Sequence, residues 1–408
     1  MTRSIALGLP CLTIVLLLAA TAPAAPLSRE ARFQAELEQI VEQYELPGAT
    51  AAFTLADGTT EVVAAGLADV ATGEPMRPAS RMLAASIGKT FVAATVLALH
   101  QEGRLDLDDS LSSWLGHRDW FARLPNADTI TLRQLLRHQS GLPDHVDDPA
   151  FHTAWQQHRT DGDAPLGPED LIAFVLDHPP LFAAGQGWSY TDTGYLLLGL
   201  VIEGASGRSY YESVTDRFLE PLGLDATTPS DRTDLPGLAT GYLSPDNPMS
   251  LPAETTVRPA VMAWDPRLEW TGGGLVSNPG DLTRWAWALF GGHALQEPYL
   301  ETLLDAVPLD TTASGPRYGL GVLLRPEGPL GPTYGHAGWI PGYVSSLRYF
   351  PDEGIAVAFQ VNTDIDMLGP AALVADDMEL RLARIALQAD DTRARTRRLD
   401  EPTLRRRP

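Results

Sequence analysis

Apolar residues recur at helical spacing over Phe33–Tyr44, which predicts an amphipathic helix. Two strand-like runs follow, Ala49–Leu55 and Glu61–Ala65, and the turn residues Ala56-Asp57-Gly58 between them predict a hairpin. Over Ser86–Gln101 the chain is apolar at almost every position, which is typical of a helix buried on all sides. A serine and a lysine at the start of such a helix therefore need a specific reason to be there.

The middle of the chain, from about residue 106 to 235, reads as helices and loops, and short strands separated by glycine and proline follow residue 239. The last element is an amphipathic helix over 371–387. Expected helical pieces and strands are Leu132–Leu136, Leu171–Leu176, Tyr195–Ile202, Tyr318–Leu324, Thr333–His336, Tyr343–Phe350 and Ile355–Val361. This order predicts an α/β (α+β) fold in which an antiparallel sheet, flanked by helices, is built from both chain ends around a mostly helical insertion.

The first 24 residues have the features of a secretory signal peptide. Arg3 precedes an apolar stretch, and Ala22-Pro23-Ala24 offers a small-residue cleavage site. An uncleaved membrane anchor is the alternative, but Pro10 interrupts an already short apolar run. The sole cysteine, Cys11, lies in this stretch, where a lipoprotein site is disfavoured, so the mature chain is expected to have no disulfide. We therefore expect a periplasmic or secreted protein.

Charge and composition define three segments: a signal peptide at 1–24, one large domain at 25–390 with a helical subdomain at about 106–235, and a tail at 391–408. The net charge of −22 argues against a nucleic-acid partner. The tail carries seven arginines and three acids, and we expect it to be disordered, with binding to an anionic surface as the alternative.

Lys89 is the only lysine in the chain, since the other 29 of its 30 basic residues are arginine. An arginine side chain stays charged in proteins, whereas a lysine can lose its proton and act as a base. Ser86 lies three positions earlier, on the same helical face. The pair predicts a nucleophile with a base beside it, and a surface lysine that happens to follow a serine is the alternative.

Several other short motifs do not match the functional patterns that they resemble. Gly88-Lys89-Thr90 lacks the upstream glycine of a phosphate-binding loop, since Leu83 stands there. No serine has the flanking glycines of a nucleophile elbow, and no histidines have zinc-binding spacing. Asp144–Asp148 (DHVDD) offers carboxylates for a cation, with a solvated acidic loop as the alternative. We expect no metal and no cofactor.

Partners for Ser86 and Lys89 occur in two later segments. Tyr190 and Asp192 lie in GWSYTDTGY, and His336 and Gly338 lie in YGHAGW. With Ser-x-x-Lys, they give three motifs in one order: Ser86-Ile87-Gly88-Lys89, Tyr190-Thr191-Asp192 and His336-Ala337-Gly338. The chain thereby resembles the serine β-lactamases and penicillin-binding proteins, on the branch of class C β-lactamases, D,D-carboxypeptidases, D-aminopeptidases and esterases. The resemblance covers about residues 33–387 and includes LLRHQSGLP (135–143), EGRLDLDDSL (102–111) and GGGLVSNPGDLTRW (272–285).

The resemblance implies acyl transfer. Ser86 would form an acyl-enzyme, Lys89 and Tyr190 would share its proton, and the backbone N–H groups of Ser86 and Trp339 would form the oxyanion hole. His336 and Gly338 would support substrate binding. It does not decide whether Lys89 or Tyr190 is the base in the resting enzyme.

Two positions depart from the family pattern. Asp192 stands where the family usually has asparagine, and a carboxylate cannot donate a hydrogen bond to a substrate carbonyl. An ionised Asp192 would favour the Lys89 ammonium and so shift the base role toward Tyr190, or it would favour a cationic substrate group; a tolerated substitution is the alternative. His336 stands where β-lactamases carry lysine, and would give a weaker, pH-dependent anchor for a substrate carboxylate.

The sequence therefore predicts an exported serine hydrolase that acts on an ester or D-amino-acid peptide bond. A D,D-carboxypeptidase or esterase is favoured over a β-lactamase. A protein of another class, which binds peptidoglycan peptides or a partner without catalysis, stays open because of Asp192. The expected partner is a small-molecule or peptide substrate, and the oligomeric state is left undetermined.

Overall fold

The computed structural model describes residues 27–157, 165–247, 249–310, 312, 314–367 and 373–388. The expected signal peptide and arginine-rich tail lie outside these residues. Within the described part of the chain, no helix is both long enough and apolar enough to cross a bilayer.

Within the described residues, one antiparallel sheet has the strand order β3-β2-β1-β14-β13-β12-β11-β10-β9. Its strands come from the two ends of the chain, because β1 pairs with β14 and places Ala51 opposite Phe359. The strands of this sheet are β1 (Gly48–Thr54), β2 (Thr60–Asp69), β3 (Glu74–Pro75), β9 (Val307–Pro308), β10 (Arg317–Tyr318), β11 (Leu323–Arg325), β12 (Thr333–Ile340), β13 (Tyr343–Phe350) and β14 (Ile355–Val361). The expected sheet built from both termini is thus confirmed.

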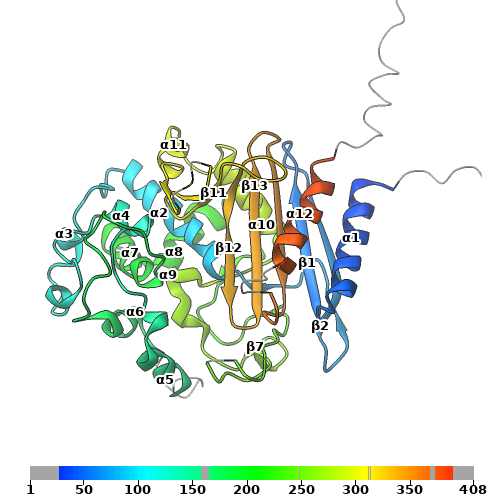
Figure 1. Ribbon diagram of the computed structural model, residues 1–408, viewed down its shortest axis with the longest axis horizontal. Helices are drawn as coiled ribbons and strands as arrows, with labels where there is room; N and C mark the ends of the chain where they lie inside the picture. Colours follow the sequence, from blue (N-terminus) through cyan, green and yellow to red (C-terminus); the bar gives the residue numbers. More distant parts are fainter. Residues whose placement is uncertain are drawn as a thin grey trace, which may run out of the picture.

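Helices cover both faces of this sheet. The terminal helices α1 (Arg29–Gln43) and α12 (Leu373–Ala386) lie side by side on one face, and α10 (Pro279–Phe290) lies on the other (Figure 1). In β14 the larger residues Val357 and Phe359 face α1 and α12, whereas Ala356 and Ala358 face α10. This alternation of side chains explains why the strand is buried along its whole length.

The helical region lies beside the β12 side of the sheet (Figure 1). Its centre is a pair of buried helices, α2 (Gly88–Gln101) and α7 (Asp192–Ser206), that pack on each other. Around them lie α3 (Leu111–Leu115), α4 (Leu132–Leu136), α5 (Pro149–Gln157), α6 (Pro168–Ile172), α8 (Tyr210–Val214), α9 (Trp270–Gly273) and α11 (Tyr299–Leu303). The 3₁₀ and π segments are η1 (Ala85–Ile87), η2 (Phe121–Arg123), η3 (His145–Asp147), η4 (Ala173–Val175), η5 (Thr215–Leu219) and η6 (Pro266–Glu269).

The described residues also form two small sheets. The first consists of β4 (Met82–Leu83), β8 (Leu275–Ser277) and β5 (Thr228–Pro229), and the second consists of β6 (Thr256–Arg258) and β7 (Val261–Met262).

One expected strand is wrong. Tyr318–Leu324 is a hairpin of β10 and β11, because Gly319 donates its N–H to the Val322 carbonyl and Gly321 adopts a positive φ of 69°. The buried helix expected over 86–101 begins with the short 3₁₀ turn η1 and continues as α2.

Candidate active site

Ser86 lies in η1, at the start of the buried helix α2. The preceding residue, Ala85, has a φ of 48°, a conformation that is unfavourable for a residue with a Cβ. Surrounding contacts hold this turn: Ser345 Oγ of β13 donates to the Ala84 carbonyl at 3.0 Å. On α2 itself, Trp285 Nε1 donates to Thr90 Oγ1 at 2.8 Å. The nucleophile candidate is therefore fixed by both the sheet and the helix α10.

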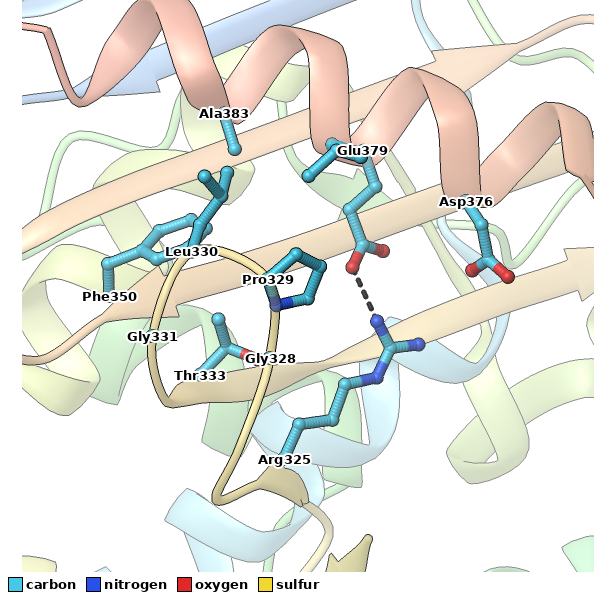
Figure 2. Close-up of a pocket in the computed structure, with 11 residues that line it drawn as sticks. Arg325, Gly328, Pro329, Leu330, Gly331, Thr333, Phe350, Asp376, Glu379 and Ala383 are labelled. Carbon is cyan, nitrogen blue, oxygen red and sulfur yellow. Dashed lines mark hydrogen bonds and ion pairs between the residues drawn. The ribbon is translucent and has the colours of Figure 1, made fainter. Parts of the chain in front are cut away.

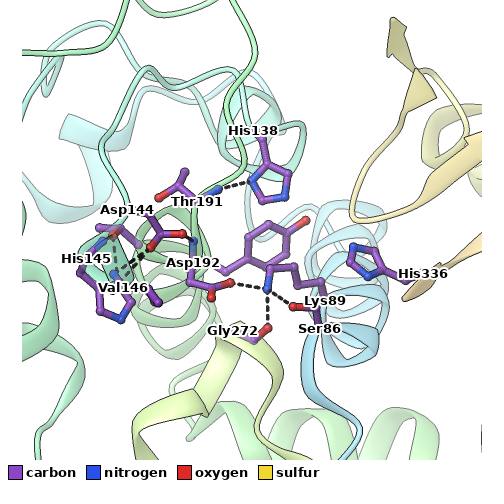
Figure 3. Close-up of polar contacts among 12 residues, drawn as sticks. Ser86, Lys89, His138, Asp144, His145, Val146, Thr191, Asp192, Gly272 and His336 are labelled. Carbon is purple, nitrogen blue, oxygen red and sulfur yellow. Dashed lines mark hydrogen bonds and ion pairs between the residues drawn. The ribbon is translucent and has the colours of Figure 1, made fainter. Parts of the chain in front are cut away.

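Lys89 lies one turn further on and is completely buried. Its Nζ contacts three oxygens: Ser86 Oγ at 3.0 Å, the Gly272 carbonyl at 2.5 Å, and a carboxylate oxygen of Asp192 in an ion pair (Figure 3). Burial alone would lower the pKa of Lys89, but the charge of Asp192 and its hydrogen bond to the amine outweigh burial and raise the pKa above its ordinary value. Lys89 is thus an ammonium in the resting site.

Tyr190 lies against this ammonium, with its ring centre 4.9 Å from Lys89 Nζ. Its hydroxyl is buried without a hydrogen bond of standard geometry, although Lys89 and Ser86 lie close enough to act on its pKa. Burial raises the pKa of Tyr190 to about 12 and outweighs the lowering by Lys89. The phenol therefore keeps its proton, which disfavours a resting Tyr190 phenolate, one of the alternatives that the sequence left open.

Asp192 is the first residue of α7, where the positive end of the helix dipole favours a carboxylate. Its backbone N–H donates to Asp144 Oδ2 at 2.9 Å, and the preceding Thr191 N–H donates to His138 Nδ1 at 3.2 Å (Figure 3). Hydrogen bonds to side chains of segment 138–144 thus fix the backbone of the Tyr190–Asp192 motif. The ring of His138 packs against Tyr190 with 4.2 Å between the ring centres.

His336 lies on β12 at the opposite side of the site and is buried. Its Nδ1 faces the Ala337 carbonyl at 2.5 Å and must donate, so its Nε2 accepts from the Tyr318 hydroxyl at 2.8 Å. Burial and the nearby Lys89 lower the pKa of His336 to about 3. It is therefore neutral throughout the physiological range, which corrects the expectation of titration near neutral pH.

Gly338 and Trp339 line the cleft above Ser86. β11 pairs only with the residues of β12 from Thr333 to Gly335, so in the described part of the chain no strand covers the outer edge of β12 beyond them. That edge packs on η1 so closely that a Cβ on Gly338 would lie 2.3 Å from the Ala84 carbonyl oxygen. The three motifs therefore meet around one cleft of about 440 Å³.

Comparisons with known proteins agree with this geometry. The beta-lactamase family profile matches residues 33–376. The chain belongs to the beta-lactamase family. It is similar to a D-stereospecific amidohydrolase from Streptomyces sp., with 30% identity, a TM-score of 0.70, and coverage of 86% of this chain and 98% of that one. The expected family and fold class are thus confirmed.

Two further relatives belong to the same superfamily of serine β-lactamases and penicillin-binding proteins. D-amino acid amidase from Ochrobactrum anthropi SV3, solved with L-phenylalanine, is 25% identical with a TM-score of 0.72, over 87% of this chain and 98% of that chain. A penicillin-binding protein of Bacillus subtilis (strain 168) is 26% identical over 312 residues, 74% of this chain. The chain spans 65% of the length of that protein.

Within the family site, the structure adds residues that sequence reasoning did not assign. The Gly272 carbonyl accepts from Lys89, Tyr318 donates to His336, and Glu269 is close enough to Lys89 and Asp192 for their charges to act on it. The run Gly272-Gly273-Gly274 in the sequence could have indicated a close approach of two backbone segments. A Cβ on Gly273 would lie 2.4 Å from the Ala85 carbonyl carbon. Tyr318 and Glu269 had no such signal.

The acidic segment 144–148 is not a solvated loop throughout. Asp144 has a side chain only 11% exposed and accepts the N–H groups of Asp192 and Val146. Burial and the Asp192 charge raise the pKa of Asp144 to about 7. Among the residues that the structure describes, no cluster of acidic, histidine or cysteine side chains could hold a metal ion.

A second cavity of about 340 Å³, which shares Arg325 and Glu379 with the Ser86 cleft, lies between α12 and the loop before β12 (Figure 2). Its mouth carries the ion pair between Arg325 and Glu379, and Arg348 binds the same carboxylate at 3.0 Å. Both arginines also line the cleft at Ser86, but they are engaged by Glu379. They therefore form a structural ion-pair cluster in the wall of that cleft.

The buried histidine predicts a pH-dependent stability. The folded state depresses the pKa of His336 from 6.5 to about 3, so its contribution to stability is complete above pH 6.5 and is lost as the pH falls toward 3. As the pH falls below 6.5, the wild type should lose unfolding free energy. Because glutamine cannot titrate, His336→Gln should lose less, by up to about 1.4 kcal/mol per pH unit. Urea unfolding at pH 7 and 4.5 measures this difference. Equal losses in both proteins would contradict a neutral, buried His336.

Proposed function

We propose that this chain is a serine hydrolase that forms an acyl-enzyme through Ser86 and cleaves an ester bond or the amide bond of a D-amino acid derivative. One observation carries the proposal: a completely buried lysine amine lies 3.0 Å from a serine hydroxyl that opens onto a cleft. Nucleophile and amine are within hydrogen-bond reach, and Asp192 and Gly272 orient the amine.

In the proposed reaction, Lys89 must first release a proton from the resting ammonium. The Ser86 hydroxyl then gives its proton to the Lys89 amine while Oγ bonds to the substrate carbonyl carbon. The proton passes from Lys89 to the leaving amine or alkoxide, with the Tyr190 hydroxyl beside this route, as the bond to the leaving group breaks. A water molecule then attacks the acyl-enzyme, Lys89 takes its proton, and Ser86 regains a proton as the acid leaves.

The oxyanion of the intermediate is proposed to accept the N–H groups of Ser86 and Trp339. The outer edge of β12 next to η1, which no strand of the described residues covers, supports this arrangement. The position of Ser86 at the start of α2 adds the positive end of that helix dipole.

The charges of the cleft favour an amidase or esterase over a carboxypeptidase. A carboxypeptidase has to bind the terminal carboxylate of its substrate, but His336 is neutral and Arg348 is bound to Glu379. Asp192 lines the cleft near Ser86 and would repel a carboxylate. The similarity to a D-stereospecific amidohydrolase supports D-amino-acid substrates. We further propose export through residues 1–24, on the sequence features alone.

Labelling and turnover test the proposal together. A fluorescent fluorophosphonate should label wild-type protein and should fail to label Ser86→Ala, which removes one hydroxyl from a half-buried position. A short-chain nitrophenyl ester, a D-amino acid amide, a D-Ala-D-Ala peptide and a chromogenic cephalosporin should then be compared, with the ester and amide turned over fastest. Absence of a Ser86 adduct would instead favour a non-catalytic binding protein.

A further inference from the structure

In the resting site Lys89 and Tyr190 both carry a proton, so neither can accept the proton of Ser86. Lys89 Nζ already makes contacts with Ser86, Asp192 and Gly272, and the ion pair with Asp192 keeps it an ammonium. Tyr190 keeps its proton as well. A group that binds in the cleft must therefore weaken the ion pair between Asp192 and Lys89, so that Lys89 can lose its proton before Ser86 reacts.

Asp192 is the member of this ion pair that a substrate can reach. Its side chain is 21% exposed, whereas Lys89 is fully buried, and it lines the cleft together with Ser86. Only its Oδ1 contacts Lys89, and its Oδ2 accepts no hydrogen bond from the described residues. An incoming cation can therefore bind the second oxygen while Lys89 remains on the first.

We infer that Asp192 is a specificity-determining residue that couples activation of Ser86 to an ammonium group on the substrate, next to the scissile carbonyl. This inference rests on the proposed function. Two cations on one carboxylate repel each other, so the bound substrate ammonium disfavours the Lys89 ammonium. For charges about 5 Å apart at an intermediate dielectric constant, the neutral fraction of Lys89 rises on the order of a hundredfold.

Charge and protons balance in this step. The substrate ammonium enters with its proton and binds Asp192, and Lys89 releases one proton to water in the cleft, so the net charge of the site is unchanged. The neutral Lys89 amine then takes the Ser86 proton during attack. A substrate without the ammonium leaves the original ion pair intact and reacts slowly, even when it fills the cleft equally well.

Several titratable groups lie close enough to Asp192 for charges to act between them. They are Lys89 on α2, Tyr190 in the loop before α7, Tyr195 on α7, Asp144 and His145 at η3, Glu269 at the end of η6, Tyr318 on β10 and His336 on β12. Burial raises the pKa of Glu269 to about 8, while burial lowers the pKa of His145 to about 4. Near pH 6 Asp144, Glu269, His145 and Tyr190 are therefore largely uncharged and Lys89 is the charged neighbour, so Asp192 is the main carboxylate available to a cation.

The test compares two substrates that differ only in the ammonium, D-alanine p-nitroanilide and N-acetyl-D-alanine p-nitroanilide, at pH 6 to 7. Wild-type protein should show kcat at least about tenfold higher for the free amine. In Asp192→Asn the free-amine reaction should slow, the N-acetyl reaction should become at least several-fold faster, and the ratio should approach one. The kcat–pH profile of the N-acetyl substrate should also move to lower pH.

The exposed carboxylate of Asp108, on the ion pair with Arg133, provides the matched control, and Asp108→Asn should leave the ratio unchanged. Asp192→Ser gives a second uncharged variant if the asparagine variant folds poorly, which circular dichroism reports. Fluorophosphonate labelling distinguishes failure of the proposed function from failure of this inference. Without any Ser86 adduct, the proposed function and this inference both fail. With an adduct, an equal slowing of both substrates in the variants overturns the inference alone.

Discussion

Lys89→Arg should lower kcat/KM for ester and amide substrates on the order of a thousandfold while the protein stays folded. Lys89 Nζ is the amine within reach of Ser86 Oγ, and a guanidinium keeps its proton at any working pH, so it cannot accept the serine proton. Removal of a positioned general base typically lowers the rate by about 10²- to 10⁴-fold. The measurement is steady-state turnover of a nitrophenyl ester, with circular dichroism and thermal melting as checks on the fold.

The chain offers a matched control for this exchange. Arg123→Lys makes the reverse change on an exposed ion pair with Asp177, and turnover should be the same as in the wild type. If Lys89→Arg kept comparable turnover and still formed the acyl-enzyme, proton transfer would not explain the single lysine. If instead it melted far below the wild type, Lys89→Met would separate the loss of the base from overpacking of the buried site.

The sheet was predictable because its central strands follow simple rules. β13 and β14 were expected at their observed bounds, because glycine and proline residues separate these short strand-like runs from their neighbours. The hairpin of β10 and β11 was missed because Gly319 and Gly321 interrupt a run whose composition reads as one strand. Backbone turns at glycine leave a weak signal inside an apolar run.

The site was predictable to the level of its motif residues. Ser86 and Lys89 are three apart on the chain, so helical geometry alone brings them together. The contacts of Asp144, Glu269 and Tyr318 join segments that are distant in sequence, and no local pattern reports them. Protonation states were equally out of reach, because those of His336 and Tyr190 depend on burial that only the fold creates.

Gly338→Ala should lower kcat on the order of a hundredfold and should also destabilise the protein. A Cβ at this position would lie 2.3 Å from the Ala84 carbonyl oxygen and 2.4 Å from Ser345 Oγ. Backbone cannot give way as a flexible side chain does, so β12 must move away from η1, which carries Ser86. Displacement of a reacting group by about 1 Å costs about 10²-fold in rate, and overpacking typically costs about 1–3 kcal/mol.

Steady-state kinetics and thermal melting measure the two effects separately, and Gly204→Ala is the matched control. The nearest atom to a Cβ on Gly204, within α7, is a ring carbon of Trp114 at 3.8 Å, and alanine favours the helix. That variant should therefore melt at or above the wild-type temperature with unchanged kcat. Wild-type kcat in Gly338→Ala would mean that the close approach of β12 to the Ser86 turn is not needed for catalysis. A loss of kcat with a melting temperature near the wild type would show that the site tolerates less displacement than the fold does.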